Sequence, residues 1–432
     1  MTENTSGPSW FFSKYLAPYL QRRFMTILIL GFVSGLPLLL SFGTLSAWLR
    51  EAGTERSTIG LFALVGLPYA LKPLWAPAMD GLNLPVLTRV LGRRRAWLVL
   101  SQFMLTFAIV CLAFSDPGGA PFIMAVFAVL VAFFSASQDI VIDAYRIEIL
   151  DEDQQGMGAA MVTYGYRAGM LVAGAGTLFL ADYWTWTHAY IVMALLVLVG
   201  SFVVLWSPEP NNVAIKHPID MTLRGWLLHY VVKPFIEFST RPGWIIILLF
   251  VVTFKLGDAF LSVMTNPFYI DLGFSKTEIA EVTKLFGILA LGLGLFIGGV
   301  LIHRLGLIST LVITGILQAV SNLVFAYQAT VGNDLGALTI TIAVENVTGG
   351  MGTAAFVAYL SGLTNTAFTA TQYALLSAFM SLGRNLLSSP SGYVVDAFGW
   401  VDFFLLSVIV ALPGLLLLFI LIRFYPNHVG RR

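Results

Sequence analysis

The sequence predicts an all-α integral membrane protein with about twelve transmembrane helices. Hydrophobic residues make up 58% of its 432 residues and charged residues only 11%, whereas a soluble globular chain carries about 25% charged residues. The apolar residues gather in runs of about 20, the length that an α-helix needs to cross the hydrocarbon core of a bilayer. Lipid is therefore the expected environment of most of this chain.

The predicted spans follow one another with short loops between them. The first apolar run is too long for the hydrophobic region of a cleaved signal peptide, so we expect it to remain as the first span. We place the spans at 24–49, 57–79, 96–114, 121–146, 156–180, 187–207, 243–266, 277–302, 307–330, 336–361, 370–395 and 401–424. With the N-terminus inside, most of the 24 Lys and Arg residues fall in cytoplasmic segments. This distribution predicts that both termini are cytoplasmic.

The strongest interruption of the apolar pattern divides the chain into three parts. We expect an N-terminal six-helix bundle at 1–207, a cytoplasmic linker at 208–242 and a C-terminal six-helix bundle at 243–432. The linker is predicted to hold an amphipathic helix that lies on the membrane surface. Its apolar face would be made of Trp226, Leu227, Tyr230, Val231 and Phe235. A plain polar linker is the alternative.

The two bundles repeat each other weakly in sequence. Residues 155–167 align with 372–384, and Asp182 aligns with Asp396. Repeats of six spans that run in the same direction are typical of the major-facilitator fold, in which the two halves are related about the membrane normal. We therefore expect this fold, with a solute cavity between the halves near the bilayer midplane.

The loop after the second span carries an acidic and basic cluster. It reads Met79-Asp80-Gly81 and, after a short insertion, Gly92-Arg93-Arg94-Arg95. This resembles the cytoplasmic G-x-x-x-D-R-x-G-R-R motif of major-facilitator proteins, which latches helix ends and helps to govern the inner gate. The resemblance implies gating roles for Asp80, Arg93 and Arg94. Positive-inside anchoring alone would explain the arginines but not the paired glycines.

Four acidic residues are predicted inside spans, where a charged side chain costs at least about 2.5–3.5 kcal/mol. Desolvation favours the neutral form of a carboxyl group, which suits a proton carrier. The proton-coupling candidates are Asp139, Asp143, Asp258 and Glu345. Asp139 and Asp143 share one helix face through their i, i+4 spacing. The alternative is structural pairing, of Asp143 with the gating candidate Arg146 and of Asp258 with Lys255.

Polar and aromatic side chains at similar depths are candidates for binding a polar solute. Arg167 and Arg384 occupy equivalent positions in the two halves and could clamp an anionic group bidentately or neutralise a buried acid. Tyr69 and Trp75 could stack on a sugar ring or only pack between helices. The full set of binding candidates is Gln138, Lys255, Asn346, Arg384, Arg167, Tyr69 and Trp75.

Several segments together resemble one transporter family. They read LGFVSGLP at 30–37, SASQDIVIDA at 135–144, YRAGML at 166–171, KLGDAF at 255–260 and ATQYALLS at 370–377. In this order they are similar to the AmpG-type muropeptide permeases of Gram-negative bacteria, over about residues 24–424. The resemblance implies import of N-acetylglucosaminyl-1,6-anhydro-N-acetylmuramyl peptides across the inner membrane, driven by the proton motive force. That uptake serves cell-wall recycling and, in many hosts, β-lactamase induction and thus antibiotic resistance.

The resemblance also implies the partners of the chain. They are the anhydro-muropeptide, protons and the lipid bilayer, and we expect a monomer. Many enterobacterial and pseudomonad members carry extra helices, whereas this sequence ends at Arg432, so we expect the twelve spans to hold the core transport unit. The net charge of +1 offers no nucleic-acid footprint. Because Cys111 is the single cysteine, we expect no internal disulfide and no cysteine metal site. The sequence also lacks metal-spaced histidines, so we expect neither a metal nor a cofactor.

Other function classes lack a matching motif. The sequence contains no phosphate-binding glycine loop and no soluble-enzyme motif, so we expect neither an enzyme nor an ATP-driven pump. A related carrier of another solute, such as acetyl-CoA, and an exporter of amphipathic drugs stay open as alternatives. A membrane enzyme or sensor would need a catalytic cluster or a signalling domain.

Overall fold

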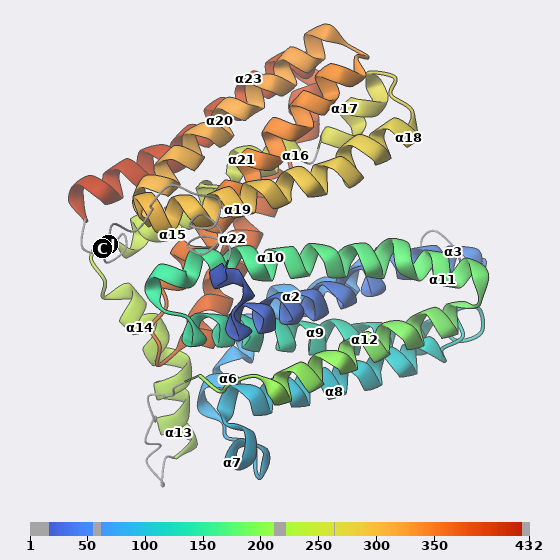
Figure 1. The fold of residues 1–432 in the computed structure, drawn as a ribbon, viewed down its shortest axis with the longest axis vertical. Helices are drawn as coiled ribbons and strands as arrows, with labels where there is room; N and C mark the ends of the chain where they lie inside the picture. Colours follow the sequence, from blue (N-terminus) through green and yellow to red (C-terminus); the bar gives the residue numbers. More distant parts are fainter. Residues whose placement is uncertain (1–16, 55–61, 211–221, 263, 426–432) are drawn as a thin grey trace, which may run out of the picture. The chain divides into compact units, whose positions relative to one another are not determined.

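The computed structural model describes residues 17–54, 62–210, 222–262 and 264–425. These residues form helices joined by short turns and contain no strand (Figure 1). They divide into two compact units: unit 1 comprises Met1–Asp151, Met161–Val232 and Asn365–Leu375, and unit 2 comprises Glu152–Ala160, Lys233–Thr364 and Leu376–Arg432. The helix α10 (Gln155–Leu171) therefore begins in unit 2, and α22 (Thr369–Ser388) begins in unit 1.

Unit 1 is built from long helices and a broken segment between them. The long helices, besides α10, are α2 (Arg22–Ser41), α8 (Arg93–Ala113), α9 (Pro121–Ile149) and α12 (Trp186–Trp206). The shorter pieces are η2 (Ala17–Leu20), α3 (Gly43–Glu51), η3 (Phe62–Gly66), α5 (Leu67–Leu71), η4 (Lys72–Leu74), α6 (Ala76–Gly81), α7 (Leu87–Leu91), η6 (Val172–Gly176), α11 (Thr177–Tyr183), α13 (Leu223–Trp226) and η7 (Leu227–Val232). Prolines at the first turns of α5, η4 and α6 divide the second predicted span into short turns.

Glycines let α2 and α10 approach until their backbones touch. A Cβ atom on Gly31 would lie 2.3 Å from the carbonyl oxygen of Val162, and one on Gly165 would lie 2.0 Å from the carbonyl oxygen of Leu28. Gly35 and Gly169 repeat this contact one turn further along. Small residues spaced four apart are the usual means of close helix packing in membranes.

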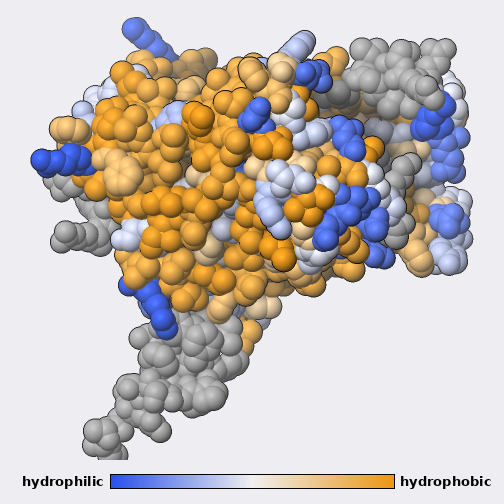
Figure 2. Space-filling model, turned by 90° about the horizontal axis from the view of Figure 1, so that it is seen from above, coloured by the Kyte–Doolittle hydropathy of each residue, from blue (hydrophilic) through white to orange (hydrophobic). Residues whose placement is uncertain are grey.

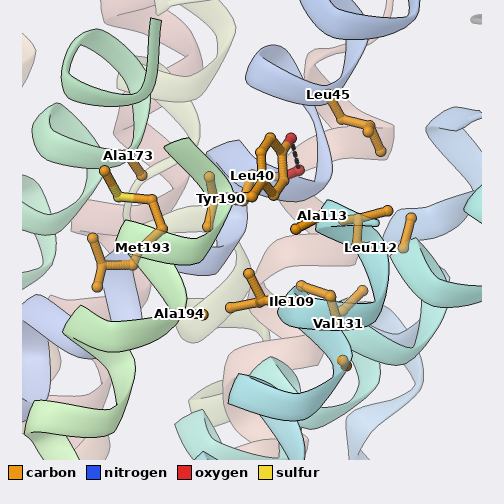
Figure 3. Packing of buried hydrophobic residues seen from close by; sticks show 14 of the residues in the cluster. Leu40, Leu45, Ile109, Leu112, Ala113, Val131, Ala173, Tyr190, Met193 and Ala194 are labelled. Atoms are coloured by element: carbon orange, nitrogen blue, oxygen red, sulfur yellow. Dashed lines mark hydrogen bonds between the residues drawn. The ribbon is translucent and has the colours of Figure 1, made fainter. Parts of the chain in front are cut away.

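The interior of unit 1 has an apolar cluster at each end of its long helices. Leu105, Val131 and Val197 belong to the first cluster, in which Tyr190 donates a hydrogen bond to the Leu40 carbonyl (Figure 3). The second cluster takes other residues of the same helices, including Leu98, Ile142 and Val204.

A polar layer separates these two clusters along the helices. Gln102 of α8, Gln138 of α9 and Ser201 of α12 fall between the apolar residues of both clusters in sequence. All three are buried, and their side chains contact no hydrogen-bonding partner within the described residues.

Unit 2 has the same helical character. Its helices are α14 (Lys233–Ser239), α15 (Trp244–Thr253), α16 (Leu256–Ser262), α17 (Thr265–Asp271), α18 (Lys276–Ile279), η8 (Ala280–Phe286), α19 (Gly287–Leu305), α20 (Leu307–Val331), α21 (Leu335–Gly362) and α23 (Ser391–Phe424), with the single turn η5 (Glu152–Gln154) before α10. Glycines again join two of them closely, because a Cβ atom on Gly294 of α19 would lie 2.1 Å from the carbonyl oxygen of Val347 on α21. The helix α23 is broken at Gly399, whose φ is 77°, and this break falls in the predicted loop between the last two spans.

The predicted all-α membrane architecture is confirmed. Within the described residues, eight helices are long and apolar enough to cross a bilayer. They begin at Arg22, Arg93, Pro121, Trp186, Trp244, Glu281, Leu307 and Ser391. The other four predicted spans fall at η3 to α6, at α10 to α11, at α21 and at α22. Large apolar side chains such as Phe107 and Phe122 are 65% and 80% exposed, and Figure 2 shows such side chains over much of the visible face, as lipid contact requires.

The linker forms a helical segment, α13, η7 and α14, between 223 and 239. Tyr230 of the predicted apolar face is buried at 1% exposure, and its ring lies against Gly81. Trp226 also turns inward and donates a hydrogen bond to the Gly81 carbonyl. Burial raises the pKa of the Tyr230 hydroxyl. The predicted residues Leu227 and Phe235 are exposed.

Candidate functional site

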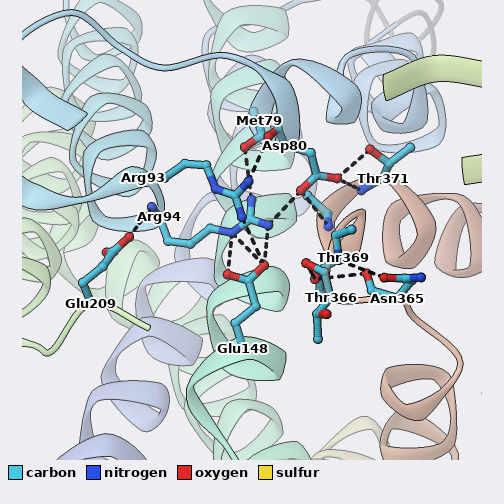
Figure 4. Close-up of polar contacts among 12 residues, drawn as sticks. Met79, Asp80, Arg93, Arg94, Glu148, Glu209, Asn365, Thr366, Thr369 and Thr371 are labelled. Carbon is cyan, nitrogen blue, oxygen red and sulfur yellow. Dashed lines mark hydrogen bonds and ion pairs between the residues drawn. The ribbon is translucent and has the colours of Figure 1, made fainter. Parts of the chain in front are cut away.

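A buried ion-pair cluster, which we name the latch, surrounds Asp80 at the end of α6 (Figure 4). The Arg94 guanidinium donates to Asp80 Oδ1 at 2.7 Å, and Arg93 donates to the Asp80 backbone carbonyl at 2.9 Å. The other carboxylate oxygen of Asp80 accepts hydrogen bonds from the backbone N–H and the hydroxyl of Thr371, at 2.8 and 2.7 Å. The Ala370 N–H donates to Oδ1 at 3.3 Å. Asp80 thus joins an arginine to the N-terminus of α22, where an anion is favoured.

Two further acids, which the sequence did not indicate, complete the latch. Glu148, on the last turn of α9, accepts from Arg94 at 3.0 and 3.1 Å and lies 3.7 Å from Arg93. Glu209 accepts from the backbone N–H groups of Arg94 and Arg95 at 2.9 and 3.1 Å, and so caps the N-terminus of α8. A Cβ atom at residue 92 would collide with Glu209, which explains the glycine there. The available signal was the acidic character of both residues near predicted cytoplasmic span ends.

Arg146, the fourth gating candidate, lies apart from the latch. Its guanidinium is 3.7 Å from Asp143 Oδ1 and lies over the ring of Tyr373, 5.5 Å from the ring centre. Arg146 is fully buried, whereas the Asp143 side chain is 22% exposed. The structure therefore contains the predicted pair, together with a cation–π contact to the first turns of α22.

Asp139 lies one turn before Asp143 on α9. Its Oδ1 accepts a hydrogen bond from the Ser34 hydroxyl of α2 at 2.6 Å. Lys72 interacts electrostatically with both Asp139 and Asp143. Lys72 is not among the binding residues predicted from the sequence, because nothing in the sequence shows that the turn containing it packs on α9.

Of the two aromatic candidates, Trp75 holds this turn in place. Trp75 donates from Nε1 to the Ser137 hydroxyl at 3.1 Å, and its ring centre is 4.7 Å from that of Phe133. Tyr69 is half-buried, and its ring centre lies 6.4 Å from that of Phe42. Trp75 therefore has a visible packing role.

The remaining unit 1 candidates face different surroundings. Gln138 is fully buried in the polar layer between the apolar clusters, whereas Arg167 on α10 is exposed. Tyr166, beside Arg167 in sequence, interacts with Asp139. Neither Gln138 nor Arg167, the two predicted polar binding residues of this unit, makes a hydrogen bond to the Asp139 carboxylate in the described structure.

Unit 2 contains the predicted pair of Lys255 and Asp258. The Lys255 ammonium is 3.4 Å from Asp258 Oδ2 and donates to the Gly349 carbonyl at 3.2 Å. Gln318 of α20 donates to Asp258 Oδ2 at 2.6 Å. Sequence reasoning missed Gln318, although a glutamine in the middle of an apolar span was a usable signal. A Cβ atom on Gly352 would lie 2.5 Å from Gln318 Oε1, so this glycine makes room for the amide.

Glu345 and Asn346 form a second polar group on α21. Asn346 donates from Nδ2 to Glu345 at 2.8 Å and to the Ile342 carbonyl at 3.0 Å. Tyr269 of α17 interacts with Glu345. Arg384 lies on α22, but its side chain is outside the described part of the structure. Within the described residues, no group of His, Cys, Asp and Glu is arranged to hold a metal ion.

Comparison with known proteins identifies relatives over almost the whole chain. The family model described as Major Facilitator Superfamily matches residues 27–269 and 254–431. The anhydromuropeptide permease of Escherichia coli (strain K12) is 43% identical over 410 residues, which cover 94% of this chain and 81% of the relative. The putative transporter AmpG 4 of Rickettsia conorii is 37% identical over 398 residues, covering 92% of this chain and 95% of the relative.

Solved structures show the same fold at low identity. The proton:xylose symporter XylE matches with a TM-score of 0.64 and 14% identity, covering 96% of each chain. The human organic anion transporter MFSD10 matches with a TM-score of 0.65 and 17% identity, covering 92% of this chain and 99% of the other. The major-facilitator fold is thereby confirmed, and the protein is a multi-pass inner-membrane carrier of a small solute. The chain belongs to the AmpG-type permeases of the major facilitator superfamily.

Proposed function

We propose that this protein imports 1,6-anhydro-muropeptides across the bacterial inner membrane by alternating access, together with protons. The observation that carries the proposal is the 43% identity, over 94% of the chain, to a protein named anhydromuropeptide permease. The cargo, an N-acetylglucosaminyl-1,6-anhydro-N-acetylmuramyl peptide, would enter the recycling of the cell wall.

The acids inside the helices support proton coupling. Asp139 accepts a short hydrogen bond from Ser34, and Asp258 accepts one from Gln318. Asp258 also lies beside Lys255. Protonation of such a carboxylate weakens the hydrogen bonds made to its charged form, which gives a physical link between a proton and the packing of two helices. Asp143 and Glu345 are the further carriers in this proposal, and Gln138, Lys255, Asn346, Arg167, Arg384, Tyr69 and Trp75 are its set of substrate-binding residues.

The latch supports a gating role at the cytoplasmic side. Its opening has to separate Asp80 from the N-terminus of α22, and Arg94 keeps its contacts with Asp80 and Glu148 when this happens. In the same proposal both termini are cytoplasmic, the protein acts as a monomer in the bilayer, and residues 1–207 and 243–432 are two bundles joined by the linker 208–242.

The test is uptake of labelled anhydro-muropeptide by proteoliposomes. Uptake that follows an imposed inward proton gradient, and that a protonophore abolishes, is the expected result. Asp139→Asn and Asp143→Asn should lose gradient-driven accumulation. They should keep exchange of labelled for unlabelled substrate, which needs no net proton movement.

Two results would contradict the proposal in different ways. If the uptake rate does not depend on the proton gradient, transport is not coupled to protons. If both variants accumulate substrate at the wild-type rate, Asp139 and Asp143 do not couple transport to protons. Absence of muropeptide uptake by the wild-type protein, with uptake of another solute class, would refute the substrate.

A further inference from the structure

Two cations and two carboxylates form an electrically balanced group in unit 1. Asp139 and Asp143 lie one turn apart on α9, Arg146 follows on the same helix, and Lys72 interacts with both carboxylates. With both acids ionised, the formal charges of these four side chains cancel. A proton that binds either acid therefore leaves one positive charge without its counter-ion.

Lys72 is held against α9 by its own turn of the chain. It opens the short helix η4, with Pro73 directly after it. Three residues later, Trp75 is fixed to α9 through its hydrogen bond to Ser137 and its contact with Phe133. Because Ser137 and both acids belong to α9, this anchor holds the turn that carries the lysine against the helix that carries the acids.

The two cations differ in how firmly they are held. Arg146 is fully buried, pairs with Asp143 and lies over the Tyr373 ring. Lys72 is half-buried, and its ammonium is on a flexible four-carbon stem with three donors. Asp139, with which Lys72 interacts electrostatically, is meanwhile hydrogen-bonded to Ser34. Lys72 is therefore the cation that can exchange one anionic partner for another.

We propose that Lys72 binds a carboxylate of the transported solute when a proton occupies Asp139 or Asp143. The proposal rests on the proposed function and adds the chemical group that the site recognises. The balance of charge is simple: one proton enters with one carboxylate, the group is neutral before and after, and no covalent bond is made or broken. A solute without a carboxylate leaves the lysine charge uncompensated and is disfavoured.

The other polar groups near this cluster leave that balance unchanged. Tyr166 and Tyr69 interact with Asp139, and Tyr373 interacts with Asp143 and Arg146. All three are phenols, which stay neutral at physiological pH. Among the described residues that interact with the two acids, the acids themselves, Lys72 and Arg146 carry the charge of the site.

The first experiment needs no substrate. Infrared absorption of protonated carboxyl groups is followed against pH in purified wild-type protein, Lys72→Met and Lys72→Arg. Loss of the lysine should move the midpoint of this absorption to higher pH, because the acids lose a favourable charge, whereas arginine should leave it near the wild-type position. Arg50→Gln, which removes an exposed cation of the same unit, is the matched control and should not move it.

The second experiment compares anhydro-muropeptide with its fully amidated form in proteoliposomes. The wild-type protein and Lys72→Arg should prefer the carboxylate form by about tenfold or more, whereas Lys72→Met should take up both forms within about twofold, as loss of one charge-assisted contact predicts. A merely structural role of Lys72 would lower both rates together and leave their ratio unchanged.

The outcomes separate the two proposals. An unmoved infrared midpoint in Lys72→Met, or a retained preference for the carboxylate form, would overturn the inference while muropeptide uptake still stands. If the wild-type protein takes up neither compound while the midpoint moves, the proposed function fails and the carboxylate assignment fails with it. Lys72 would then remain only the counter-ion of the acids.

Discussion

Asp80→Asn tests whether the latch holds the start of α22. The wild-type carboxylate is fully buried and accepts from one guanidinium, two backbone N–H groups and one hydroxyl. An asparagine keeps one acceptor oxygen but presents an NH₂ group where the second oxygen was. That NH₂ group would face donors, and it carries no charge to complement the N-terminus of α22.

The size of the effect follows from these contacts. Breaking a buried ion pair outright costs about 3–5 kcal/mol, but Arg94 keeps Glu148 as a partner. The loss is then closer to that of one or two hydrogen bonds to a charged group, each about 1.5–3 kcal/mol. A value of about 3 kcal/mol corresponds to roughly a hundredfold change in the equilibrium between held and released segments.

Hydrogen exchange measures this release directly. The Ala370 and Thr371 amides donate to Asp80, so their exchange rates should rise by roughly a hundredfold in Asp80→Asn if the segment opens locally. Asp151→Asn is the matched control, because it removes an acid of the same unit whose side chain is 72% exposed. Exchange at residues 370 and 371 that stays at the wild-type rate would refute the reasoning.

Three further changes test other contacts. Gly165→Ala should lower the free energy of unfolding by about 1–3 kcal/mol through backbone collision, measured by thermal unfolding in detergent. Gly176→Ala, whose new Cβ would have its nearest neighbour at 3.6 Å, should not, and equal stability of the two variants would contradict the packing argument. Gln318→Leu removes a 2.6 Å hydrogen bond to Asp258 and should cost about 1.5–3 kcal/mol in the same assay; an unchanged transition would show that this bond contributes nothing. Glu209→Gln weakens the cap of α8. If this cap contributes about 1 kcal/mol, hydrogen exchange of the first amides of α8 should become about fivefold faster. An unchanged exchange rate would show that Glu209 does not cap this helix.

The fold was predictable because lipid imposes a simple rule on the sequence. Every backbone group in the bilayer has to be bonded within its own helix, so apolar length alone locates the spans. The second span was harder, since three closely spaced proline-containing turns break it into η3, α5, η4 and α6. Where such turns begin and end depends on what they pack against, which the sequence does not state.

The sequence predicted where along the helices the site residues lie, but not the direction in which their side chains point. The pairs Asp143 with Arg146 and Lys255 with Asp258 are local on one helix, so spacing alone indicated them. Gln138 adjoins Asp139 in sequence, but a single residue turns the side chain by about 100° around a helix, and it is buried in the bundle interior instead. Glu209 escaped prediction because 115 residues separate it from the amide that it caps.

One helix connects the two polar clusters of unit 1. Glu148 of the latch and the Asp139, Asp143 and Arg146 group all belong to α9, which is continuous from Pro121 to Ile149. Both clusters also contact the same short segment, since Thr371 bonds to Asp80 and Tyr373 lies beneath Arg146. Neutralising Asp143 would weaken its ion pair with Arg146. Because Arg146 also contacts Tyr373, this would change how the start of α22 is held, and the latch holds the same segment. In the proposed mechanism, a proton bound at Asp143 and the release of the α22 N-terminus thus act on one set of contacts, with no need for a signal that travels through the rest of the fold.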